Sequence, residues 1–132
     1  SDVGTVTLLS FTPWDRISNG SAGTHAVPQL TGRGGLHEGT SVTVQLESAL
    51  ENAAAMLVIG NSLALDTTHG CLGPSADVLV PLATDETGAA SHHETWPEGQ
   101  ASGTTVYYQF RVADPAAEWG EALSNTLAAV AP

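Results

Sequence analysis

Residues 104–115 of this chain read Thr-Thr-Val-Tyr-Tyr-Gln-Phe-Arg-Val-Ala-Asp-Pro. One set of alternate positions holds only apolar or aromatic side chains: Val106, Tyr108, Phe110 and Val112. The positions between them hold Thr105, Tyr107, Gln109 and Arg111. This period of two predicts a β-strand with two different faces. Asp114-Pro115 ends the strand, because proline has no N–H to donate and restricts the residue before it.

The same reading extends over the rest of the chain. Further strands are predicted at 3–11, 41–48, 54–60, 63–65, 76–83, 89–96 and 126–130. Pro13-Trp14 ends the first of these, and Thr84 to Gly88 is predicted to be a hairpin turn. Asp66 to Pro74 is expected to be rich in turns, and Trp119 to Asn125 to be the last connection. Short strands separated by turn signals predict an all-β fold, an antiparallel β-sandwich of about seven to nine strands that is immunoglobulin- or jelly-roll-like without a disulfide.

The 132 residues are expected to form one domain. Residues 18–39 are rich in Gly, Ser and Thr, and so long a connection is either functional or hides short strands, for example from Thr24 to Leu30. Residues 1–12 would then be a tethered N-terminal strand that is exchangeable with a neighbouring subunit.

The charge balance excludes some partners. The chain has fourteen acidic residues, three arginines and no lysine, for a net charge of -11. Nucleic acid is excluded, because binding phosphates requires clustered basic residues. No apolar run approaches the ~18 residues of a membrane-spanning helix, so no membrane insertion is expected. Self-association would need salt, divalent cations or strong apolar contact. This composition, poor in charged residues and rich in Thr, Ser, Gly and Ala, favours an extracellular or cell-surface protein.

Candidate sites are few. Cys71 is the single cysteine, which rules out an intramolecular disulfide and a multi-cysteine zinc site. No serine lies in a Gly-x-Ser-x-Gly elbow, and the spacing of histidines and carboxylates indicates no nucleophile and base. We therefore predict no enzymatic activity, no catalytic residue, no metal site and no cofactor. Trp96 is expected to be a partly buried plug at the end of the sandwich. Flanked by Glu94 and Glu98, it is also the basis of one alternative, a surface that contacts glycan or calcium.

Several motifs resemble one family. They are Gly70-Cys71-Leu72, Thr84-Asp85-Glu86-Thr87-Gly88, Tyr107-x-Gln109-x-x-Val112-x-Asp114-Pro115 and Leu123-Ser124-Asn125. Over residues 41–130 the chain resembles the small β-rich modules at the C-termini of large secreted planctomycete and myxobacterial proteins. The resemblance implies a secreted β-sandwich and no catalytic residues. Members often carry a second cysteine near the N-terminus, which this chain lacks.

Two hypotheses from different classes follow. In the first, the chain is a non-catalytic structural module that assembles with copies of itself into a fibre or surface layer by strand addition or sheet edges. The assembly residues would be Val3, Val6, Leu8 and Phe11. In the alternative, it is an extracellular module that binds glycan or calcium.

Overall fold

The computed structural model describes residues 14–36, 39–66, 71–96, 98–99, 101 and 103–131. These residues form eleven strands and no helix, and every strand pairing is antiparallel. The predicted all-β, antiparallel class is confirmed, with more strands than the sequence predicts. In this part of the chain there is no helix long and apolar enough to cross a membrane.

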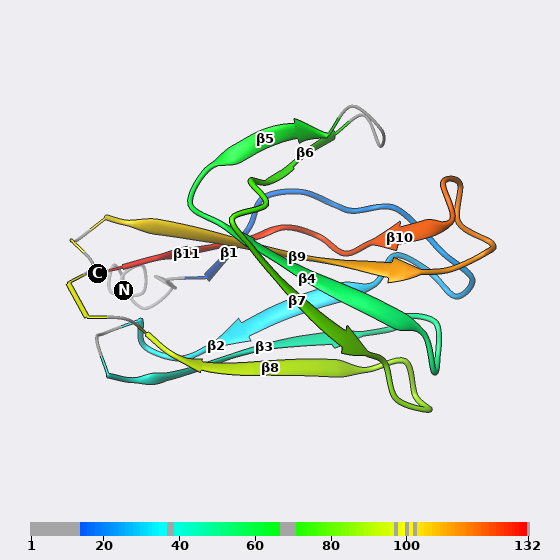
Figure 1. The fold of residues 1–132 in the computed structure, drawn as a ribbon, viewed down its shortest axis with the longest axis horizontal. Helices are drawn as coiled ribbons and strands as arrows, with labels where there is room; N and C mark the ends of the chain where they lie inside the picture. Colours follow the sequence, from blue (N-terminus) through cyan, green and yellow to red (C-terminus); the bar gives the residue numbers. More distant parts are fainter. Residues whose placement is uncertain are drawn as a thin grey trace, which may run out of the picture.

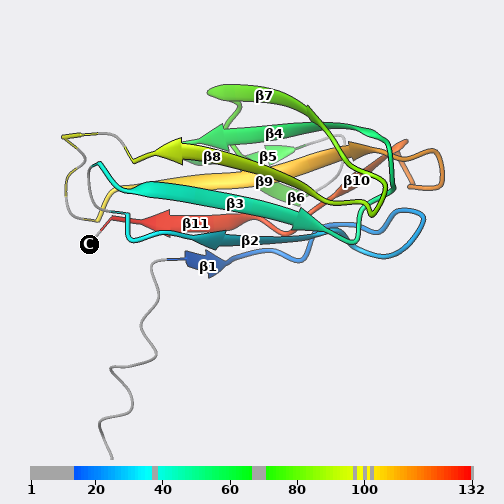
Figure 2. The same ribbon diagram turned by 90° about the horizontal axis from the view of Figure 1, so that it is seen from below.

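The strands form three sheets (Figures 1 and 2). The large sheet has the order β1 (Trp14–Arg16), β11 (Leu127–Val130), β9 (Thr105–Ala113), β4 (Ala54–Gly60) and β7 (Val78–Ala83), and β10 (Glu121–Leu123) also pairs with β9. The small sheet has the order β2 (Gln29–Arg33), β3 (Ser41–Glu47) and β8 (Ala90–Thr95). A separate hairpin consists of β5 (Leu63–Asp66) and β6 (Cys71–Pro74).

One core cluster lies between the large and small sheets. Tyr108, Phe110 and Val112 of β9 belong to it and are at most 1% exposed, as the alternation in this strand predicts. The small sheet contributes Val42 and Val44, also 1% exposed. Each such side chain stabilises the fold by about 1.5–3 kcal/mol relative to an exposed position. The alternation in β9 and β3 therefore decides which faces of the two sheets meet.

The outer face of β9 is partly covered as well. Gln109 is 2% exposed although its position alternates with the core residues. The β5–β6 hairpin packs over it, because β6 lies against β9 and Gly73 has no side chain to keep them apart. A Cβ on Gly73 would lie 2.9 Å from Oε1 of Gln109.

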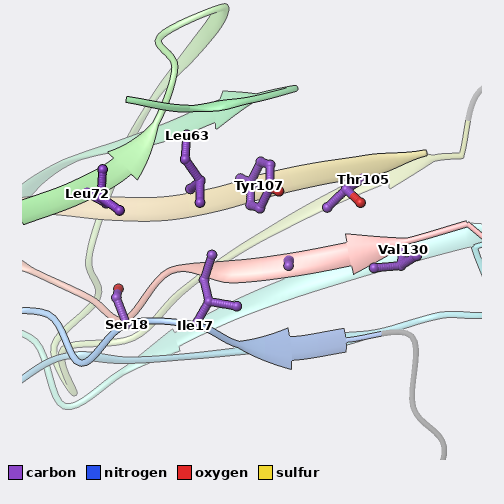
Figure 3. A pocket seen from close by; sticks show the side chains of 8 residues that line it. Ile17, Ser18, Leu63, Leu72, Thr105, Tyr107 and Val130 are labelled. Carbon is purple, nitrogen blue, oxygen red and sulfur yellow. The ribbon is translucent and has the colours of Figure 1, made fainter. Parts of the chain in front are cut away.

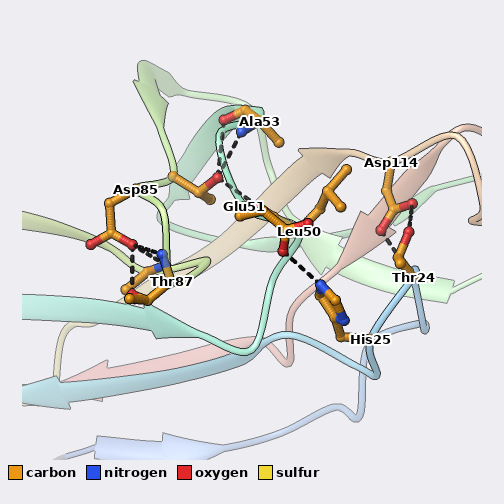
Figure 4. Close-up of polar contacts among 10 residues, drawn as sticks. Thr24, His25, Leu50, Glu51, Ala53, Asp85, Thr87 and Asp114 are labelled. Atoms are coloured by element: carbon orange, nitrogen blue, oxygen red, sulfur yellow. Dashed lines mark hydrogen bonds and ion pairs between the residues drawn. The ribbon is translucent and has the colours of Figure 1, made fainter.

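The predicted hairpin at Thr84–Gly88 is wrong, although the turn itself forms. Oδ1 of Asp85 accepts hydrogen bonds from the N–H groups of Thr87 (2.8 Å) and Ala89 (3.0 Å), as Figure 4 shows in part. The flanking strands do not pair with each other, since β7 pairs with β4 and β8 pairs with β3. The chain crosses between sheets here, because turn chemistry is local and does not select the partner of the next strand.

A second crossing connection, residues 48–53, runs beside the first. The N–H of Ala49 donates to the carbonyl of Gly88 (3.1 Å), and the N–H of Asn52 donates to that of Asp85 (3.0 Å). Buried Thr84 adds its hydroxyl, which donates to Leu50 O at 2.6 Å and accepts from the N–H of Ala53 at 2.8 Å. The two connections thus hold the sheets together at one end.

The short strands correct four other predictions. Trp14 begins β1 instead of ending a strand, and the strand hidden in 18–39 is β2, later than the 24–30 expected. β6 lies within the turn-rich 66–74, and β10 lies within the last connection, 119–125. These strands are three to five residues long, too short for a clear period of two, and their partners supply the pairing. The predicted first strand, 3–11, lies outside the described residues.

Candidate functional site

An apolar groove of about 290 Å³ lies between the outer face of the large sheet and the β5–β6 hairpin (Figure 3). Its lining comes from five segments of the chain: Ile17, Ser18, Leu63, Leu72, Thr105, Tyr107, Ala128 and Val130. We call this surface the outer groove.

The floor of the outer groove comes from two neighbouring strands. Thr105 and Tyr107 occupy outward positions of β9, and Val130 and Ala128 are their Cα partners on β11. Paired residues in an antiparallel sheet point to the same face, so the four side chains form one patch. The sequence predicts the outward positions in β9, and the pairing with β11 completes the floor.

The walls of the outer groove expose large apolar side chains. Leu63 and Leu72 on the hairpin are 38% and 53% exposed, and Ile17 on the opposite side is 42% exposed. Ile17 and Ser18 are held by the chain just before β11. The N–H of Ile17 donates to the carbonyl of Thr126 (3.0 Å), and the hydroxyl of Ser18 accepts from the N–H of Thr126 (2.9 Å).

The outer groove has an uncharged lining. None of its lining residues carries a carboxylate, an imidazole, a thiol or a permanent charge. The hydroxyl of Ser18 already accepts a backbone hydrogen bond and faces no base in the lining. The groove therefore suits apolar side chains of a partner.

A polar cluster lies on the inner face of the large sheet, where Glu94 and His92 of β8 in the small sheet meet Tyr108 of β9. Oε2 of Glu94 accepts a hydrogen bond from the hydroxyl of Tyr108 (3.3 Å), and its Oε1 lies 3.0 Å from Nε2 of His92. Burial, and next the charge of Glu94, raise the pKa of Tyr108 well above its usual value. Tyr108 therefore remains a hydrogen-bond donor to the carboxylate. Among the described residues no group of three or more His, Cys, Asp or Glu side chains is placed to hold a metal ion.

The residues of the glycan or calcium alternative are not brought together as an open platform. Trp96 is 1% exposed and belongs to the core cluster, so its ring has no free face for a sugar. Glu94 faces His92 and Tyr108, and Glu98 is exposed. The assembly residues Val3, Val6, Leu8 and Phe11 lie outside the described residues.

Other polar contacts fasten the loop at residues 24–25 (Figure 4). The carboxylate of Asp114 accepts hydrogen bonds from the N–H and hydroxyl of Thr24, both at 2.6 Å, and from the N–H of Ala116 at 3.0 Å. Burial opposes ionisation of Asp114, but these hydrogen bonds outweigh it and lower its pKa. Beside it, Nε2 of His25 lies 2.7 Å from Oε2 of Glu51, and this hydrogen bond lowers the pKa of Glu51. These contacts fix the loop.

Comparison of the chain with protein-family models, curated proteins and solved structures found no match. The resemblance to planctomycete and myxobacterial modules stays a prediction.

Proposed function

We propose that this protein is a non-catalytic structural module that associates with copies of itself, outside the cell or on its surface. The observation that carries the proposal is the outer groove. Exposed apolar residues scattered over a surface are ordinary, whereas a set that converges in one uncharged groove is typical of an interaction site.

The occupant of the groove is a second copy of the chain. The net charge of -11 makes long-range repulsion between copies strong at low salt. The lining residues carry none of that charge, so the groove is a place where two copies meet without opposing carboxylates. When salt screens the repulsion between copies, burial of the apolar lining supplies the attraction.

The proposal is tested on the full chain by light scattering coupled to size exclusion, with negative-stain microscopy, at 150 mM NaCl. Two exposed leucines form a matched pair: Leu72 in the groove is 53% exposed, and Leu79 on β7 is 52% exposed. Leu72→Ser should weaken association about tenfold, the effect of losing roughly 1.4 kcal/mol of contact, while Leu79→Ser leaves it nearly unchanged.

Three outcomes contradict this proposal. A wild-type chain that stays monomeric at every protein and salt concentration rules out self-association. Equal effects of Leu72→Ser and Leu79→Ser show that the outer groove is not the contact. Turnover of a substrate by the wild-type chain would show that the protein is not merely structural.

A further inference from the structure

We propose that β8 is an acceptor edge to which residues 3–11 of a second copy add as a further strand of the small sheet. The inference rests on the proposed function in that it assumes self-association, and it names the partner segment and the surface that receives it.

β8 has an available backbone edge. Among the described strands it pairs only with β3. Trp96, which follows β8, donates its N–H to Thr40 O (2.8 Å) and accepts from the N–H of Gly39 (3.1 Å). Pairing alternates along an antiparallel ladder, so Glu94 and His92 bond to β3 while Ser91, His93 and Thr95 direct their N–H and C=O groups away from it. Such groups are a template for another strand.

The edge of the small sheet opposite to β8 is occupied. The N–H of Leu30 in β2 donates to Oδ1 of Asn125 (2.7 Å), and Nδ2 of Asn125 donates to the carbonyl of Leu30 (2.9 Å). Arg16 of β1 also donates to the side chain of Gln29 in β2 at 2.7 Å. These contacts join β2 to the large sheet, so a strand cannot add there without breaking them.

The edges of the large sheet are less suited to pairing. β1 has only three residues, and β7 contains Pro81, which has no N–H to donate. β8 has six residues and no proline. It is as long as β7 and, unlike β7, has an N–H group at every position.

Apolar side chains of β4 and β7 on the inner face of the large sheet are only partly buried. Ile59 of β4, with Val80 and Leu82 of β7, packs against the core but is only partly buried. Val78 is the Cα partner of Ile59, faces the same side and is 50% exposed. β2 lies against β1 and β11, and Glu94 of β8 reaches Tyr108 of β9. A strand added beyond β8 would therefore lie on the β4 and β7 side of the large sheet, where this apolar row is.

The sequence of residues 3–11 fits that position. It alternates Val6 and Leu8 with Thr5 and Thr7, so one face matches the spacing of Val78 and Val80. The segment carries no charged residue. This matters because Glu94 faces inward on β8, and an inward charge discourages unselective edge pairing. A neutral strand adds no repulsion to that charge.

A second copy is the donor for a geometric reason. The segment enters the fold at β1, at one edge of the large sheet, while β7 is the opposite edge. Four interstrand spacings, roughly 19 Å, separate the two edges, whereas the three residues from position 11 to Trp14 reach at most about 11 Å. Donation to a neighbour makes a head-to-tail contact that does not close, and it would produce a filament.

Cross-linking between two full-length variants tests the inference. All variants carry Cys71→Ser, so that the introduced thiols are the only ones in each chain. The donor variant carries Thr7→Cys. Acceptor variants, labelled with ¹⁵N, carry Ser91→Cys or Thr95→Cys on β8, and the matched control carries Thr31→Cys on the capped edge β2. All three acceptor positions are exposed. A short bismaleimide joins neighbouring thiols, and mass spectrometry identifies cross-links between labelled and unlabelled chains.

Donor cross-links to β8 should exceed those to β2 about tenfold, the preference that 1.4 kcal/mol gives. Equal yields at β8 and β2 overturn the inference. So does a double variant, Thr7→Cys with Ser91→Cys, that cross-links within the monomer at high dilution. Hydrogen exchange of the wild-type chain gives a second reading, because strand addition must protect the amides of Ser91, His93 and Thr95 upon association.

The same experiment separates the two proposals. If light scattering shows association while the β8 cross-links are missing, strand addition is wrong and the proposed function stands. If no variant and no wild-type sample associates, both are wrong.

Discussion

The side-chain amide of Asn125 forms two hydrogen bonds with the backbone of Leu30, a residue 95 positions earlier in the chain. Both residues are buried. The amide offers a carbonyl oxygen and an N–H group to Leu30, as a neighbouring strand would. One side chain therefore pairs with the outward N–H and C=O of Leu30 and attaches the small sheet to the large one on this side.

Asn125→Ala should lower the free energy of unfolding by about 2–3 kcal/mol, because it leaves the buried N–H and C=O of Leu30 without partners. Urea denaturation measures the change. Gln45→Ala, on the outer side of β3, should change stability by less than about 0.5 kcal/mol. An Asn125→Ala chain as stable as the wild type would show that water or a shifted backbone replaces the amide.

Asp114→Asn should cost about 1–3 kcal/mol at pH 7, because Thr24 and Ala116 then lose charged acceptors. The pKa of Asp114 is lowered by folding, so its contribution is full above the unfolded pKa of about 3.9 and is lost as the pH falls through the folded value. The stability difference between the variant and the wild type should therefore shrink below about pH 4.

Urea midpoints at pH 7, 5, 4 and 3 measure this pH dependence. Glu118→Gln serves as the control because Glu118 is exposed in the same loop, and it should be nearly neutral. A difference between Asp114→Asn and wild type that stays constant down to pH 3 would contradict the assignment.

Gly60→Ala should destabilise the fold by about 1–3 kcal/mol, because the new Cβ would meet the backbone carbonyl of Ser75. Gly73→Ala is the matched strand substitution, and there the nearest atom is the end of the Gln109 side chain, at 2.9 Å. That side chain is able to move, so its cost should be smaller. Thermal unfolding of both variants measures the contrast, and equal losses would show that backbone contact does not decide the outcome.

Association of the wild-type chain should strengthen as salt rises. The Debye length falls from about 30 Å at 0.01 M to about 8 Å at 0.15 M, which screens the repulsion between copies that carry a net charge of -11. Light scattering across this range measures the apparent association constant. Weakening with salt would instead indicate an interface held by ion pairs.

Strands with a long alternating pattern could be predicted from the sequence because each carries its own signal. Residues 105–113 and 41–47 bury the face that the alternation predicts. The short β1, β6 and β10 carry no such signal, and they form because β11, β5 and β9, respectively, pair with them.

The candidate surfaces could be predicted less well from the sequence. The alternation puts Tyr107 on the opposite face from Tyr108, but nothing local places Leu63, Leu72, Ile17 and Val130 around it. Trp96 is compatible by sequence with a surface platform between two glutamates or with a plug at the end of the sandwich, and its 1% exposure agrees with the plug.

The sequence by itself determined the all-β class, the faces of the long strands and the acidic net charge, because alternation and charge can be read from the residues themselves. Tertiary structure alone decided that β7 and β8 separate into different sheets, that Asn125 bonds to Leu30 at one edge of the small sheet and that, among the described strands, β8 pairs only with β3. Those features depend on contacts between residues distant in the chain, and the free energy of such contacts is set by the packed arrangement rather than by any local pattern.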